Sequence, residues 1–172
     1  MVLLRGNVYM TRLTILFLAL LSVCSIALAD PPKDYPFVSF DKGLSEAKAQ
    51  NKKVFVYFGR FGCAYCDIVN KTVFIDPDLK ALYIKNYVLV YVDAESGKRL
   101  RLPSGEKITE ADLGAHYKVF GTPVFVYLEA DGKVIGSIPG MQTVQNFKDY
   151  DRYVMEGHYK TQSLLEFLKG AK

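Results

Sequence analysis

Two cysteines three residues apart, Cys63 and Cys66, are the residues of this chain best suited to chemistry. They follow the apolar run Val54–Phe58 after a short loop, so they are expected at the start of a helix that leaves a buried strand. Free amide groups and the helix dipole favour an anion there, so the first thiol should ionise near neutral pH. The second lies one turn further along the same helix face, close enough for a disulfide. The pattern predicts a thiol pair that passes reversibly between dithiol and disulfide.

A structural zinc site uses the same cysteine spacing and is the first alternative. Such a site needs four ligands. The two histidines of the chain, His116 and His158, would have to complete it, and neither lies in a cluster with ligand spacing. The sequence therefore favours a redox role for the cysteines, and neither a metal nor another cofactor is expected.

The first 29 residues have the pattern of a secretory signal peptide. Leu13–Ile26 is an apolar stretch preceded by Arg5 and Arg12, and small residues lead to a cleavage point after Ala29. A helix that spans a membrane needs about 20 apolar residues, more than this stretch provides. We therefore expect export with removal of residues 1–29, and an uncleaved N-terminal anchor remains the alternative.

The remaining residues have the composition of one globular domain, expected over 38–172. The chain of 172 residues has 22 basic and 18 acidic side chains, and loss of Arg5 and Arg12 leaves 20 basic ones. This balance gives no reason to expect nucleic acid or anionic lipid as a partner. Cys63 and Cys66 are then the only cysteines, and a disulfide closing so short a loop would stabilise the fold little. A redox role explains the pair better.

Three apolar runs indicate buried strands. Each is five residues long, rich in β-branched and aromatic side chains and without polar alternation, which is typical of strands buried on both faces. The runs are Val54–Phe58, Val88–Val92 and Val124–Leu128. A turn at Glu129–Lys133 predicts a hairpin into a fourth strand, Val134–Ile138.

Helices are expected between the strands and after them. Asp41 is expected to cap the first, and Thr109 with Asp112 forms a capping-box pattern before another. Residues 30–37 are expected to form an extended leader, and residues 94–107 a polar surface loop. Strands separated by helices predict a mixed α/β sheet. The expected helices are 41–52, the one that begins with the cysteines, 77–85, 109–117, 143–155 and 163–169.

The order of these features resembles the thioredoxin superfamily. A strand is followed by the helix with Cys63-Ala64-Tyr65-Cys66 and by two more strands, the second preceded by Gly121-Thr122-Pro123. The resemblance covers residues 38–170. It is closest to exported, periplasmic thioredoxin-like proteins, including those of sulfur-oxidation systems, because of the long insert between Asp93 and Pro123. It implies a thioredoxin fold: a mixed central sheet flanked by helices, with an insert before the strand of the cis-proline.

The resemblance also implies roles for the site residues. Cys63 would attack a substrate disulfide as a thiolate, and Cys66, the more buried thiol, would resolve the mixed disulfide. Pro123 would be the cis-proline facing the disulfide, and Thr122, Pro123 and Tyr65 would form the substrate-binding surface. The implied function is a monomeric periplasmic thiol–disulfide oxidoreductase that reduces protein disulfides and is recharged by a membrane thiol electron donor.

Two positions depart from the family pattern. Gly62 stands where the family usually has an aromatic residue before the first cysteine, and Phe61 is expected to cover part of that surface. Tyr57 stands in place of a buried acid of the strand. Proton removal from Cys66 would then need water or Asp67.

Two functional alternatives remain open. A disulfide oxidase or isomerase would use the same residues and differ in reduction potential. Outside the enzymes, a redox-inert interaction module could keep the fold for binding alone. Its cysteines would resist alkylation in the reduced folded protein, whereas the Cys63 thiol of an enzyme would react quickly.

Overall fold

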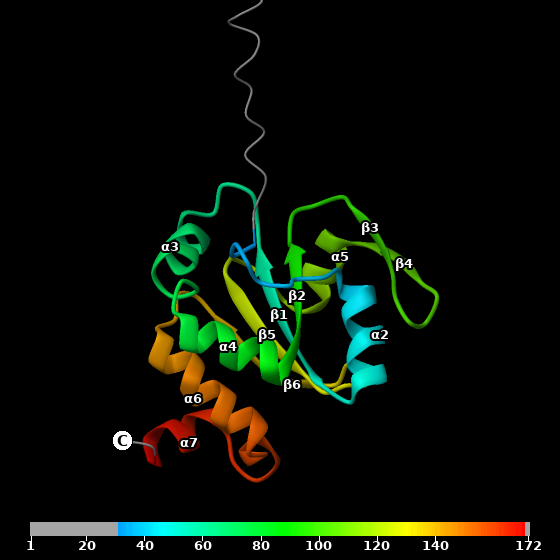
Figure 1. The fold of residues 1–172 in the computed structure, drawn as a ribbon. Coiled ribbons are helices and arrows are strands. Elements are labelled where there is room, and N and C mark those ends of the chain that lie inside the picture. The colour runs from blue at the N-terminus through cyan, green and yellow to red at the C-terminus, as the bar shows by residue number, and fades with distance from the viewer. Residues whose placement is uncertain (1–30, 171–172) are drawn as a thin grey trace, which may run out of the picture.

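A mixed four-stranded sheet is the centre of the computed structural model, which describes residues 31–170 (Figure 1). Its strand order is β2-β1-β5-β6. β1 (Lys53–Gly59) runs parallel to β2 (Tyr87–Asp93) and antiparallel to β5 (Val124–Leu128), which forms a hairpin with β6 (Val134–Pro139). The expected mixed α/β sheet with a closing hairpin is confirmed.

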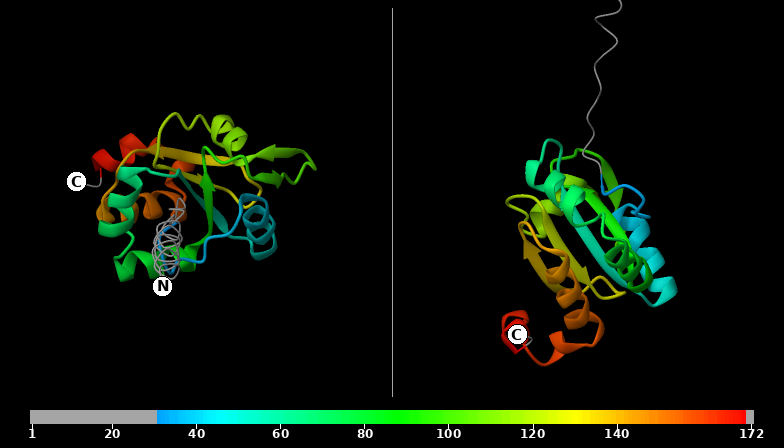
Figure 2. Two further views of the ribbon diagram at one scale, coloured as in Figure 1. Left: turned by 90° about the horizontal axis from the view of Figure 1, so that it is seen from above. Right: turned by 60° about the vertical axis from the view of Figure 1, so that its left-hand side comes forward.

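Helices cover both faces of this sheet, which explains why its central strands have no polar alternation (Figure 2). Successive side chains of β1 point to opposite faces. Phe55 and Tyr57 belong to one buried cluster, and Val54, Val56 and Phe58 belong to the other. The first cluster packs under α3 (Ala64–Thr72), α4 (Pro77–Asn86), α6 (Val144–Met155) and α7 (Leu164–Gly170), and the second under α2 (Phe40–Gln50) and α5 (Glu110–His116).

Local capping decides where the helices begin. The capping box predicted for Thr109 and Asp112 is present, with each side chain accepting from the other residue's backbone N–H. The prediction for α2 was wrong in one detail: its N-cap is Ser39, and Asp41 lies in the first turn. An acidic side chain is favourable there because the helix dipole is positive at that end. A short 3₁₀ helix, η1 (His158–Lys160), which the sequence did not indicate, joins α6 to α7.

Residues 94–107 were expected to form an irregular loop, and this prediction was also wrong. They contain β3 (Arg99–Arg101), which pairs antiparallel with β4 (Lys107–Thr109) as a separate two-stranded sheet. Leu100 is buried and Ile108 packs against the same core cluster, so one face of this β3–β4 hairpin is apolar. The alternation of apolar and basic residues was the signal, and it was hidden by the Gly and Pro residues nearby.

The segment before α2 packs against the domain. Tyr35 is buried, and its ring stacks on Phe37 and contacts the edge of Phe74. Val38 forms a parallel bridge with Val90 of β2. The expected signal peptide, residues 1–29, lies outside the described residues. Within residues 31–170, every helix is too short or too polar to cross a membrane.

Tyr159 ties the C-terminal segment to an ion pair at the edge of the sheet. Lys53 Nζ donates to Glu129 Oε2 at 2.7 Å and to Tyr159 Oη at 3.0 Å, and Tyr159 Oη in turn donates to Glu129. Burial acts to raise the pKa of Glu129, but the hydrogen bonds from Lys53 and Tyr159 outweigh it and hold the pKa below its ordinary value. The ionised carboxylate is therefore the form that the fold stabilises.

We expect Glu129→Gln to destabilise the protein at neutral pH by about 1–2 kcal/mol, since a hydrogen-bonded ion pair is lost. A carboxyl whose pKa is lowered by folding stabilises the protein above its unfolded-state pKa, and this contribution disappears as the pH falls through the folded-state pKa. Urea unfolding at a series of acidic pH values should therefore show the difference from wild type shrinking. A difference that stays constant with pH would contradict this account. The control is Glu106→Gln, at an exposed position, which should differ little from wild type at any of these pH values.

Candidate active site

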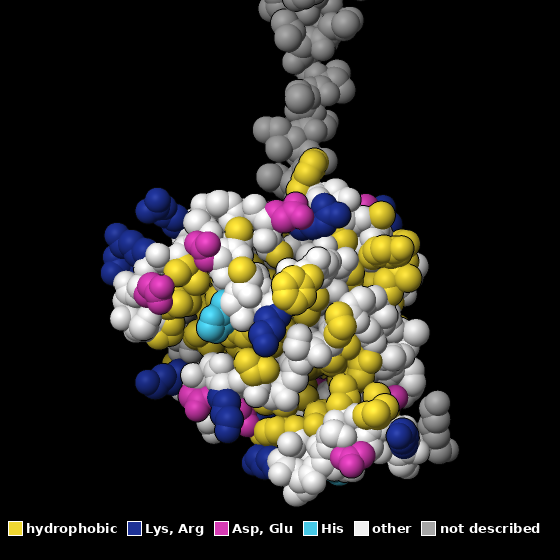
Figure 3. Space-filling model, turned by 180° about the vertical axis from the view of Figure 1, so that it is seen from behind, with side chains coloured by type: hydrophobic (Ala, Val, Ile, Leu, Met, Phe, Trp, Pro, Cys, Tyr) yellow, Lys and Arg dark blue, Asp and Glu magenta, His cyan; other side chains and the backbone are white. Residues whose placement is uncertain are grey.

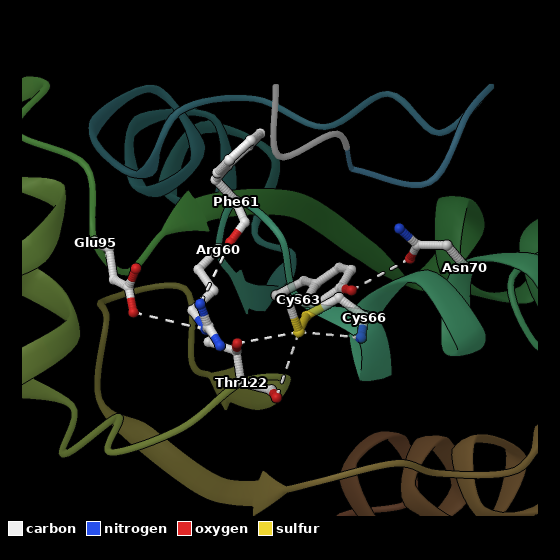
Figure 4. The surroundings of a disulfide bond; sticks show 8 residues. Arg60, Phe61, Cys63, Cys66, Asn70, Glu95 and Thr122 are labelled. Carbon is white, nitrogen blue, oxygen red and sulfur yellow. Dashed lines mark hydrogen bonds and ion pairs between the residues drawn. A yellow bond between two sulfur atoms is a disulfide. The ribbon is translucent and has the colours of Figure 1, made fainter. Parts of the chain in front are cut away.

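Cys63 and Cys66 form a disulfide at the N-terminus of α3 (Figure 4). Their Cα atoms lie 5.2 Å apart. Cys63 is the N-cap residue of the helix, and the backbone N–H of Cys66 donates to its Sγ at 3.1 Å. The cysteines are therefore at the helix start that the sequence predicts, with one backbone donor already directed at the first sulfur.

Two glycines, Gly59 and Gly62, shape the connection between β1 and α3. A Cβ on Gly59 would lie 2.5 Å from the hydroxyl of Tyr91, so a side chain at the end of β1 would require the Tyr91 ring to move. Gly62 has φ +66°, in the left-handed region that glycine adopts without strain. The residue that departs from the family's aromatic pattern thus has a conformational role. Phe61 beside it is 56% exposed and points away from the disulfide (Figure 4).

Thr122 approaches the same sulfur from the start of β5. Its Oγ1 donates to Cys63 Sγ at 3.2 Å, and its carbonyl oxygen lies 3.5 Å from that sulfur (Figure 4). In the disulfide, Cys63 has no proton to donate, so the carbonyl contact becomes a hydrogen bond only in the thiol form. The peptide between Thr122 and Pro123 is cis.

These contacts have opposite effects on the ionisation of the reduced Cys63 thiol. The N–H of Cys66 and the hydroxyl of Thr122 stabilise a thiolate because both are donors, and the N-terminus of α3 adds to their effect. The Thr122 carbonyl favours the protonated thiol instead. In the described part of the chain, the groups recorded within hydrogen-bonding distance of Cys63 Sγ are therefore all uncharged.

The two sulfurs share one environment. Cys63 is 6% exposed and Cys66 is 5% exposed. In the disulfide form the two residues are almost equally buried, because the covalent bond holds both sulfurs together at the helix start, and the expectation that Cys66 is the more buried thiol stays a prediction for the reduced protein. Cys63 is distinguished instead by its hydrogen bonds, which make it the better stabilised anion.

Tyr57 occupies the position of the family's buried acid. Its hydroxyl donates to Oδ1 of Asn70, one turn after Cys66 on α3, at 3.2 Å. Burial, with smaller contributions from Tyr91 and Asp67, raises the pKa of Tyr57 well above its ordinary value, so this side chain stays neutral. It can hold α3 in place but cannot accept a proton from Cys66. Asp67 is exposed and lies 3.8 Å from Lys71 Nζ.

Exposed apolar side chains surround the disulfide. Phe120, two residues before Thr122, is 95% exposed, and Tyr65, between the cysteines, is 60% exposed. A groove of about 630 Å³ beside Thr122 and Pro123 is lined by residues 117–118 and 120–124 and by the end of β6. An exposed aromatic residue next to a groove is typical of a surface that contacts another molecule.

The structure brings four of the five predicted site residues together and leaves Tyr65 apart. Cys63, Cys66 and Thr122 are in direct contact, Pro123 is next to Thr122, and Tyr65 projects into solvent from α3. Sequence reasoning missed an ion pair between Arg60 Nε and Glu95 Oε1, which are 3.6 Å apart (Figure 4). The parallel register of β1 with β2 brings these distant residues together, and that register was the only available signal.

No metal centre is evident in residues 31–170. Among them, no group of three or more His, Cys, Asp or Glu side chains is arranged to hold a metal ion. His116 belongs to α5 and His158 to η1, so each lies on a different element from the cysteines.

A family model described as a thioredoxin-like domain matches residues 40–155, which is more than half of the chain. The chain belongs to the thioredoxin-like family. The expected superfamily and fold class, with a mixed sheet between helices and an insert before β5, are confirmed. No curated protein matches the chain.

Solved structures support the same fold. A thioredoxin-fold protein from Helicobacter pylori is 23% identical, with 70% of this chain and 82% of that chain covered and a TM-score of 0.61. A thioredoxin from Thermus thermophilus is 27% identical, with 70% and 87% covered and a TM-score of 0.58. A disulphide isomerase from Xylella fastidiosa is 19% identical, with 72% and 98% covered and a TM-score of 0.51.

Family membership and the cysteine pair together support thiol–disulfide oxidoreductase as the class of function. The narrower resemblance to sulfur-oxidation proteins lies outside these comparisons and stays a prediction.

We expect Thr122→Val to destabilise the Cys63 thiolate and so raise the pKa of the thiol. The substitution removes one of the two hydrogen-bond donors to Cys63 Sγ and keeps the side-chain volume. Iodoacetamide alkylation of the reduced protein, measured against pH, should have its midpoint raised by about 0.5–1 pH unit. Thr161→Val, at the C-cap of η1 and outside the site, is the matched control. An unchanged midpoint in Thr122→Val would mean that the hydroxyl does not act on the sulfur.

Proposed function

We propose that this protein is an exported thiol–disulfide oxidoreductase that reduces disulfides in other proteins. The observation that supports it best is the Cys63–Cys66 disulfide at the start of α3, in contact with Thr122 beside Pro123, within a thioredoxin-like domain. Export to the periplasm is supported by the signal-peptide pattern of residues 1–29.

The reaction uses the two cysteines in sequence. The Cys63 thiolate attacks one sulfur of a substrate disulfide, forms a mixed disulfide, and displaces the other substrate sulfur as a thiolate that takes up a proton. Cys66, after losing its proton, attacks Sγ of Cys63 and releases the second substrate sulfur. Two electrons pass to the substrate, and the protein is left with the Cys63–Cys66 disulfide.

The groove beside Pro123 supports a polypeptide as substrate. Residues 120–124 and the end of β6 offer an open, largely apolar surface next to the attacked sulfur. Phe120 and Tyr65 would lie on either side of a bound disulfide and cover apolar side chains of an extended segment. Thr122, Pro123 and Tyr65 are in this proposal the substrate-binding residues.

Reduction rather than oxidation is favoured by the uncharged surroundings of Cys63. A strong disulfide oxidant needs a strongly stabilised thiolate, because this stabilises its reduced form. Here two neutral donors are opposed by the Thr122 carbonyl, and the nearby Arg60 is paired with Glu95. This balance of contacts stabilises the Cys63 thiolate only moderately. A moderately stabilised thiolate is expected in a reductant.

Repeated reduction requires a supply of electrons. Each turnover leaves the oxidised pair, and an exported protein is separated from the thiol pools of the cytosol. We infer that a membrane thiol electron donor restores the dithiol, and that the protein acts as a monomer that presents the same sulfurs to donor and substrate in turn.

Serine variants separate the two cysteines. Cys63→Ser should abolish reduction of insulin disulfides, since the attacking sulfur is lost, whereas Cys66→Ser should accumulate mixed disulfides that are visible on non-reducing gels. Both variants should keep the wild-type fold by circular dichroism. Wild-type activity in Cys63→Ser would eliminate the enzyme proposal and leave the redox-inert module.

The reduction potential of the Cys63–Cys66 pair decides the direction of electron flow. We expect a value near that of thioredoxin, about −270 mV, measured by equilibration with glutathione or dithiothreitol. A potential near about −120 mV, as in a strong disulfide oxidant, would overturn the assignment as a reductase in favour of the oxidase.

A further inference from the structure

The β3–β4 hairpin has a cationic face that the reaction at the disulfide does not use. Side chains alternate along each strand, so Leu100 and Ile108 point to the core while Arg99, Arg101 and Lys107 are exposed on the other face. The hairpin projects from the side of the domain (Figure 1), and basic side chains gather over it on the left of Figure 3. We call Arg99, Arg101 and Lys107 the cationic face.

The register of the hairpin brings like charges together. Arg101 lies directly opposite Lys107, and Arg99 is the next outward residue on the same strand. Like charges directly opposite each other destabilise a strand pair. Between residues 98 and 109 the only acid is Glu106, and the neighbouring cation Lys98 is already paired with Glu110 at 3.2 Å. The cationic face therefore costs stability in the free protein.

The arginines of the domain divide into two kinds. Arg60 and Arg152 each have an acidic partner, Glu95 and Asp149. For Arg99 and Arg101, the remaining arginines of residues 31–170, no ion pair is recorded. A guanidinium group offers a planar fork of donors that fits a carboxylate with two hydrogen bonds. The unpaired arginines are thus suited to carboxylates supplied by another molecule.

We propose that the cationic face binds acidic side chains of a protein that exchanges disulfides with Cys63 and Cys66. This inference rests on the proposed function. The hairpin is connected to the active-site loop through Glu95. This residue lies four positions before the start of β3 at Arg99, and it pairs with Arg60 in the loop before Cys63. A typical interface covers about 800 Å² on each partner, far more than one disulfide, so a folded partner docked on Cys63 extends over neighbouring surface.

Anionic lipid and nucleic acid fit this surface less well. Basic segments that bind anionic membranes usually have about 4–8 Lys or Arg residues, often with apolar side chains that insert. None of the large exposed hydrophobic residues lies on the hairpin. Residues 98–109 also contain no aromatic residue on which a base could stack.

The experiment compares three disulfide peptides of one length, flanked by acidic, by neutral or by basic residues. The pre-reduced protein is mixed with each oxidised peptide, and the second-order rate of single-turnover reduction is measured. The test variant combines Arg99→Gln, Arg101→Gln and Lys107→Gln. A control with the same loss of charge combines Lys85→Gln, Lys160→Gln and Lys169→Gln, three exposed lysines on α4, η1 and α7.

We expect the test variant to reduce the acidic peptide about tenfold more slowly than wild type at low salt, because steering by opposite charge is lost. The deficit should shrink in about 500 mM salt, where charges are screened. The neutral peptide should be reduced at the wild-type rate by both variants, and the control should keep the acidic preference.

Equal losses in the test and control variants, or no loss in either, would overturn the cationic face as a docking surface while the reductase proposal stands. Failure of wild type to reduce even the neutral peptide would instead overturn the proposed function. Wild type that sediments with phosphatidylglycerol vesicles, when the test variant does not, would replace the acidic protein with a membrane surface.

Discussion

The hydrogen bonds to one sulfur atom, Cys63 Sγ, are the interaction on which the function depends. One comes from the N–H of Cys66 on α3, and the other comes from the hydroxyl of Thr122 before β5. These donors belong to segments almost sixty residues apart in the chain. They meet because β1 and β5 pair antiparallel, with Phe58 opposite Val124, so the end of one strand lies beside the start of the other.

A core rich in aromatic residues holds α3 in that position. Phe55 and Phe125 stack across the sheet, and Phe147 of α6 packs edge-on against Phe125 with ring centres 4.9 Å apart. The buried hydroxyls of Tyr83 and Tyr127 lie 2.6 Å apart and pair with each other, and that of Tyr83 also donates to a carbonyl of α6. A polar group buried without a partner would be costly. The rigid layer beneath the helix therefore keeps the cysteines at a fixed place.

The insert between β2 and β5 serves two purposes in this arrangement. Its inner side completes the second core cluster through Leu100 and Leu113, which explains why it folds rather than remaining a loop. Its outer side is free of packing constraints, and there the charges of Arg99 and Arg101 are presented to solvent. The Arg60–Glu95 pair joins this insert to the loop that precedes Cys63.

Local patterns in the sequence determined the strands, most helices and the position of Cys63 and Cys66 at a helix start, because burial and capping act over a few residues. The contact of Thr122 with Cys63 and the Arg60–Glu95 ion pair depended on tertiary structure, because strand register brings distant segments together. The β3–β4 hairpin lies between these cases: its alternation is local, but only contact with Phe40 and Leu113 in the core shows which face is inside.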